Sequence, residues 1–395
     1  MRIGLPWLFL PWGAICAGLL LSIAAWLLPD CGILRKGYEH REALGEQALL
    51  LLLAWYALSG LAAYAGFALG SRWRIDARKY SILCPLDEPA GLLALRLLTW
   101  LGIGYAWVTI GSGLGVSGVQ DAIAGTQGND FTKALYESYS IGVASLRYGA
   151  ILLGGLAIWR VLTEKSVGPG TLFDIAALGL NAVVSSRLSI VAASVIGILL
   201  VYAGEGRLSV RAKRKLLIYV CVAFAALTLL NSLRNTNYYE SQHVYNPWVA
   251  NVSEIIAYLG SPFQGSVWAA NEYVQLVRKG EDVGLPNVEE NLTTNSAFLE
   301  LITHTGGLSW FIAPLILLLS ALIMGVCARI MSTWFALMYG ALLYNFLEYW
   351  RIMLFTKGIS LTLLALVAVA ALVSALVRYN KSRDPLPYTD LVGGD

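Results

Sequence analysis

The sequence predicts an all-α fold, a polytopic bundle of about ten transmembrane helices. Of its 395 residues, 57% are hydrophobic and only 13% are charged, roughly half the charge of an average soluble domain. Apolar segments of 18 or more residues recur along the whole chain, and in lipid such segments are stable as helices. We therefore expect residues 1–395 to form a single transmembrane domain.

Apolar windows define the expected spans. The first window is too long for the apolar core of a signal peptide and has no small-residue cleavage site after it, so it is taken as a span. The connections that carry most Lys and Arg, among them "SRWRIDARK" and "RLSVRAKRK", are placed in the cytoplasm, together with both termini. The expected spans are 5–28, 46–69, 91–111, 141–162, 171–185, 188–203, 216–232, 308–326, 333–349 and 359–377.

Two long segments then fall outside the cytoplasm. Residues 112–140 are Gly-rich and then amphipathic, and residues 233–305 are rich in aromatic and amide side chains. The second segment is too short for an independent enzyme domain, but it is long enough to roof a cavity. Its aromatic residues fit two roles, anchoring at the membrane interface or stacking against sugars.

The longest apolar run, 171–203, contains an arginine at its centre. As one helix it would be about 50 Å long, against about 30 Å of bilayer hydrocarbon. We predict that it breaks at "SSR" into two spans of about 15–17 residues, with a turn recessed below the outer surface. Arg187 would then lie at the bottom of a depression, where a charge must face water, a partner or a ligand. Asp174 lies near the opposite end of the run and is too distant to neutralise it.

Three further arginines are expected near the same membrane boundary. Arg234 and Arg351 follow expected spans directly, and Arg147 lies in the outer half of another. Each could simply extend to lipid headgroups. Together with Arg187 they favour an anion site, because guanidinium groups bind phosphate in a bidentate manner. A headgroup whose apolar tail stays in lipid, such as a polyprenyl pyrophosphate, fits this position.

Candidate side chains for proton transfer lie in the second outer segment and at the end of the span 333–349. Most of these side chains are expected to be ordinary solvated charges, and Glu348 with Arg351 could be a simple ion pair one helical turn apart. The histidines and cysteines show no metal-binding spacing, so no metal or cofactor is predicted. The candidates are Glu240, His243, Glu254, Glu272, Glu289, Glu290, Glu300, His304 and Glu348.

Two local patterns resemble the bacterial O-antigen polymerase (Wzy) family and, more distantly, the O-antigen ligases. These are "SSRLSIVAASVIGILL", a small-Ser-Arg turn that opens a span, and "TTNSAFLELITHTGGLSWFIAPLIL" at 293–317. The likeness extends over most of the chain in span number and in the large outer loop. It implies a GT-C-like bundle in the bacterial inner membrane, with a periplasmic active site that uses no metal.

The chain departs from the family at one position. Where the ligases and some polymerases have a histidine before the asparagine, this sequence has Thr294 before Asn295. The role of catalytic base that is proposed for that histidine therefore cannot be assigned to a residue at this position of the chain. His304 or Glu300 could take the proton instead, or no side-chain base is needed, since a neutralised pyrophosphate leaves readily.

The resulting hypothesis is a glycosyltransferase of lipopolysaccharide or exopolysaccharide biosynthesis, which polymerises glycan repeat units carried on undecaprenyl pyrophosphate. Catalytic roles are expected for Arg187, Arg234, His304 and Glu300. Substrate-binding roles are expected for Arg351, Arg147, Asn295, His243 and Glu348.

The resemblance also implies a chain-length regulator and a flippase as partners. No feature of the sequence indicates binding to nucleic acid.

Three alternatives stay open. A ligase would transfer finished glycan to another acceptor. A transporter or flippase of an anionic lipid or solute would also use a broken helix, but it needs access from both faces, and the sequence suggests no recessed cation cluster in the cytoplasmic half. A structural subunit of an export complex would tolerate alanine at every outer arginine.

Overall fold

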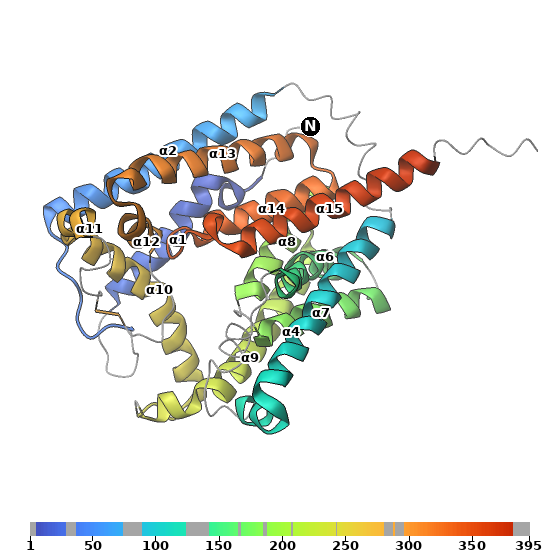
Figure 1. Ribbon diagram of the computed structural model, residues 1–395, viewed down its shortest axis with the longest axis horizontal. Coiled ribbons are helices and arrows are strands. Elements are labelled where there is room, and N and C mark those ends of the chain that lie inside the picture. Colours follow the sequence, from blue (N-terminus) through green and yellow to red (C-terminus); the bar gives the residue numbers. More distant parts are fainter. Residues whose placement is uncertain are drawn as a thin grey trace, which may run out of the picture.

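The computed structural model is a bundle of α-helices with short 3-10 turns, and the part of the chain that it describes contains no strand (Figure 1). Figure 1 shows α2 and α13 side by side, α14 and α15 across the middle, and α4 and α6–α9 on the far side of α14. The description covers residues 5–28, 37–73, 89–123, 142–164, 167–184, 188–206, 208–241, 243–279, 287–288 and 296–381.

Every apolar window predicted as a span coincides with a helix. The window 141–162 begins with a 3-10 helix, η2 (Val143–Tyr148), which continues into α6 (Gly149–Thr163). The other windows are α1 (Pro11–Leu27), α2 (Glu46–Arg72), α4 (Pro89–Ile123), α7 (Pro169–Val184), α8 (Leu188–Glu205), α9 (Val210–Ser241), α13 (Ser309–Ile330), α14 (Thr333–Glu348) and α15 (Gly358–Lys381).

Six helical stretches in the described residues are long and apolar enough to cross a membrane, which makes this a multi-pass membrane protein. They are centred on α2, α4, α6, α8, α13 and α15. The remaining four predicted spans, α1, α7, α9 and α14, are helical but fall outside this set. The ten predicted spans all contain helices in their described residues, but only six helical stretches meet the length and composition of a span, so the expected number of about ten spans is not confirmed.

The run 171–203 contains two helices. α7 ends at Val184 and α8 begins at Leu188, on either side of "SSR", and the predicted turn at 185–187 itself lies outside the described residues. The two helices have 16 and 18 residues, about 24 and 27 Å along their axes.

The outer segments are more helical than the sequence suggested. α4 continues to Ile123 past a non-helical residue, Gly115 with φ 68°, so the segment predicted to begin at 112 is helical at its start. The segment 233–305 contains the end of α9, α10 (Pro247–Asn271), α11 (Tyr273–Lys279) and α12 (Ala297–Thr305). The sequence analysis assigned no secondary structure to most of this segment, and most of its described residues are helical.

α10 is a packed helix with a polar interior face. Its first turn is set by Asn246, whose side chain accepts from the Trp248 amide at 2.9 Å, and by Pro247 at the first helical position. It contacts α1, α2 and α9. Hydropathy windows missed it because much of its buried face is polar: Asn251, Ser253, Glu254, Ser261, Gln264 and Ser266.

Two apolar cores share α14. One core joins α1, α2, α10, α12 and α13, and the other joins α4, α6, α8 and α15. Tyr339 and Leu343 of α14 lie in the first, while Leu337 and Ala341 lie in the second. Because α14 is buried on both sides, its C-terminal end is held firmly between the two halves.

Candidate functional site

The best-defined polar assembly lies where α10 and α12 meet the linker between α14 and α15. This linker, 349–357, includes the 3-10 helix η5 (Leu354–Thr356). Ser296 caps α12 by accepting from the Leu299 amide at 3.0 Å, which fixes where the helix starts. α12 presents Glu300 to the linker.

Glu300 attaches α12 to the linker at two points. Its Oε2 accepts a hydrogen bond from the Met353 backbone amide at 3.1 Å, and its Oε1 forms an ion pair with Lys357 Nζ. The Glu300 side chain is 17% exposed. Both carboxylate oxygens are therefore engaged, and Glu300 positions the linker in this structure.

Glu348 and Arg351 form a buried ion pair at the start of the same linker. The Arg351 Nε donates to Glu348 Oε2, and the two side chains are only 7% and 10% exposed, Glu348 first. The Arg351 guanidinium also lies 5.9 Å from the centre of the Tyr258 ring on α10. The ion pair that the sequence offered as an alternative is present, so the charge of Arg351 is already balanced.

Arg147 is enclosed by its own 3-10 helix. Its Nη1 donates to the Ala144 carbonyl at 2.9 Å, its Nη2 donates to the Tyr148 hydroxyl at 3.2 Å, and the guanidinium lies 4.5 Å from the Tyr148 ring centre. The residue is 3% exposed. It therefore does not extend to headgroups in this structure.

The two candidate histidines differ in setting. His304, on the exposed side of α12, places Nδ1 2.8 Å from the Glu300 carbonyl oxygen. Since a carbonyl only accepts, Nδ1 carries the proton, and in the neutral ring Nε2 holds the basic lone pair. His243 is exposed in the turn between α9 and α10, with φ 59°.

The remaining predicted site residues are not placed as side chains. Arg187 and Asn295 lie outside the described residues, and Arg234 lies in α9 with its side chain also outside the description. Of the four outer arginines predicted to form a cluster, the structure therefore describes the side chains of Arg147 and Arg351. Each of these two interacts with other groups of the protein.

A second polar cluster was missed from the sequence. Asp174 of α7 is fully buried and accepts from Arg96 Nε at 2.8 Å, Arg96 Nη2 at 2.7 Å and Arg160 Nη1 at 3.3 Å. It lies at the end of α7 away from Val184. The expectation that no recessed cation cluster exists at that end is wrong. An acid and two arginines within apolar windows were the available signal.

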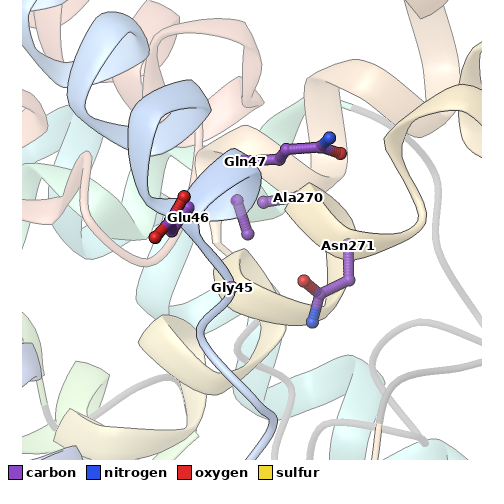
Figure 2. A pocket seen from close by; sticks show the side chains of 6 residues that line it. Gly45, Glu46, Gln47, Ala270 and Asn271 are labelled. Atoms are coloured by element: carbon purple, nitrogen blue, oxygen red, sulfur yellow. The ribbon is translucent and has the colours of Figure 1, made fainter.

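An open pocket of about 430 Å³ lies between the start of α2 and the end of α10 (Figure 2). In Figure 2 the amide of Asn271 and the carboxylate of Glu46 lie on different sides of it. None of the predicted site residues lines this pocket, and within the described ranges no group of three metal-ligating side chains occurs. The lining residues are Gly45, Glu46, Gln47, Ala48, Ala270 and Asn271.

No family model, curated protein or solved structure matches the chain.

Proposed function

We propose that this protein is an inner-membrane glycan polymerase whose active site faces the periplasm. It would transfer a growing glycan from undecaprenyl pyrophosphate to the end of a new lipid-linked repeat unit. The observation that supports this most is the break between α7 and α8. α7, with 16 residues and a length of about 24 Å, is shorter than the hydrocarbon layer, and α8, with 18 residues, is at the lower limit for a span, which suits a recessed Arg187 within reach of a lipid-borne pyrophosphate.

The chemistry divides between charge stabilisation and proton removal. A hydroxyl oxygen of the acceptor sugar forms a bond to the donor's anomeric carbon, while the bond from that carbon to the pyrophosphate oxygen breaks and its electron pair leaves with the phosphate. Arg187 and Arg234 would stabilise this charge. The hydroxyl proton would pass to His304 or to water, because both oxygens of Glu300 are occupied.

Arg351 has a supporting role in this proposal. With Glu348 beside it, it adds little net charge, but it fixes the start of the linker that α12 holds through Glu300. The second segment that carries the family resemblance, which includes α12, therefore packs directly against the linker that carries Arg351.

Reconstitution tests the proposal. The full-length protein in liposomes, given a lipid-linked oligosaccharide repeat unit, should produce a ladder of glycan lengths. Arg187→Ala should lower the rate about 10²–10³-fold, the usual cost of removing one such charge contact. A single capped product would indicate a ligase instead, and an unchanged ladder with Arg187→Ala would overturn the assignment.

A second candidate is transport of an anionic lipid or solute. It is favoured by one observation, the Arg96–Asp174–Arg160 cluster at the end of α7 opposite the Arg187 turn. Transport requires access to the substrate site from both faces, and cationic groups at both ends of α7 would attract an anion from either side. In the same liposomes, a transporter would move labelled lipid-linked oligosaccharide between leaflets without lengthening the glycan.

A further inference from the structure

The Arg96–Asp174–Arg160 cluster joins three helices. Arg96 comes from the first turns of α4, Asp174 from the first turns of α7, and Arg160 from the last turn of α6. Arg96 also donates from Nη2 to the Gly170 carbonyl at 3.1 Å. The three side chains therefore meet at one level of the bundle, about two turns or less from the ends of their helices.

The cluster carries an excess positive charge. One carboxylate faces two guanidinium groups, which leaves one charge unbalanced among the described side chains of the cluster. A guanidinium has five N–H donors. Within the described ranges, Nη1 of Arg96 and both Nε and Nη2 of Arg160 make no hydrogen bond to the protein.

Both arginine side chains of the cluster are partly exposed. Asp174 is 0% exposed, whereas the Arg96 and Arg160 side chains are 23% and 19% exposed. The buried carboxylate thus holds the two guanidinium groups in place from within, while part of each arginine side chain stays accessible. Lys215 of α9 donates to the Glu164 carbonyl at 2.7 Å, just past the end of α6, and adds a further cation nearby.

We infer that this cluster binds a phosphate group at the membrane boundary, the phosphate being that of an anionic lipid. Two arginines held by one buried carboxylate form a fork of donors with net positive charge, and phosphate oxygens satisfy such donors in a bidentate manner. All three side chains lie within about two turns of the ends of their helices, which suits a phosphate group at the membrane boundary. This inference is independent of the proposed polymerase activity, because the cluster lies at the other end of α7.

Native mass spectrometry of the full-length protein in neutral detergent tests the inference. The probes are phosphatidylglycerol, phosphatidylcholine and glycerol phosphate. One phosphatidylglycerol should bind more tightly than phosphatidylcholine, and Arg160→Gln should weaken it about tenfold, the scale of one charge-assisted contact. Arg329→Gln is the matched control. It removes the same charge from an arginine that donates to the Ser71 carbonyl at 3.4 Å, away from the cluster.

The outcomes separate the sources of phosphate. Binding that glycerol phosphate displaces at equal concentration would assign the site to soluble phosphate compounds and overturn the lipid assignment. Equal affinity in Arg160→Gln, or the same loss in Arg329→Gln, would overturn the site itself.

A measurement on the unaltered chain covers the case in which Arg160→Gln fails to fold. Phosphatidylglycerol should slow hydrogen exchange in peptides from 156–164 and 169–178 relative to phosphatidylcholine. No difference between the two lipids there would contradict the inference.

Discussion

Glu300 on α12 accepts a hydrogen bond from the backbone amide of Met353, 53 residues later in the chain, at 3.1 Å. The same carboxylate pairs with Lys357, so the short helix α12 and the α14–α15 linker form one unit. This contact assigns Glu300 a positioning role, which is distinct from the general-base role that the sequence left open.

Substitution of Glu300 tests these two roles. Glu300→Gln keeps an acceptor for the Met353 amide and loses only the partly exposed ion pair, so stability should fall by less than about 1 kcal/mol. Glu300→Ala leaves the amide without its partner and should cost about 1–3 kcal/mol. Thermal unfolding in detergent measures both. If Glu300→Gln abolishes polymer formation while the melting temperature stays unchanged, Glu300 is the base and the positioning role is wrong.

The Glu348–Arg351 pair should show strong coupling. Both side chains are at most 10% exposed, so Arg351→Met leaves a buried carboxylate unpaired and should cost about 3–5 kcal/mol. The double variant Glu348→Gln/Arg351→Met removes both charges and should be less destabilised than Arg351→Met alone. A double-mutant cycle from unfolding measurements checks this. Additive losses would mean that the pair contributes no interaction of its own.

How far the sequence predicted this structure depends on the type of signal. The division of the run 171–203 into two helices followed from its length, because 33 apolar residues as one helix would be longer than the bilayer hydrocarbon. α10 escaped detection because its buried face carries Asn251, Gln264 and other polar side chains, so hydropathy reports it as a loop. These polar side chains can be buried because they form hydrogen bonds to neighbouring helices. The spacing of apolar residues in the sequence does not reveal such contacts.

Contacts of the candidate site were less predictable than its helices. The i, i+3 spacing of Glu348 and Arg351 gave their pairing in advance as one alternative. The Glu300–Met353 and Arg96–Asp174 contacts join segments 53 and 78 residues apart, and no local rule of spacing connects them. Only the unfavourable placement of Asp174, Arg96 and Arg160 in apolar runs hinted that partners had to exist.

Close packing of α2 on α13 should be sensitive to a single methyl group. A Cβ on Gly66 would lie 2.1 Å from the Leu318 carbonyl oxygen, whereas a Cβ on Gly60 of the same helix would meet nothing within 4 Å. Gly66→Ala should therefore destabilise the protein by about 1–3 kcal/mol. Gly60→Ala is the matched control and should be neutral or stabilising by up to about 1 kcal/mol, because alanine favours the helix.

These two variants are compared by thermal unfolding in the same detergent. Similar melting temperatures for Gly66→Ala and Gly60→Ala would show that α2 and α13 are not in the close contact described.

Gln264 should be essential for the packing of α10 against the rest of the bundle. Its Oε1 accepts from Trp26 Nε1 at 2.7 Å and from the Glu42 amide at 3.1 Å, and its Nε2 donates to the His40 carbonyl at 2.8 Å. Gln264→Leu keeps the approximate size but leaves these groups unsatisfied, at about 1–3 kcal/mol for each buried one. We expect a loss of several degrees in melting temperature. Asn271→Leu, at an exposed residue that donates to the Ala43 carbonyl, should change the melting temperature little.

A second measurement follows from the Trp26 contact. Loss of the hydrogen bond to its indole places the ring beside an apolar side chain, so the tryptophan emission of Gln264→Leu should differ from that of Asn271→Leu at temperatures where both are folded. If Gln264→Leu has the melting temperature and tryptophan emission of the unaltered chain, α10 does not contact α1 through this residue. The main contact that joins the segment 233–305 to the rest of the bundle would then be wrong.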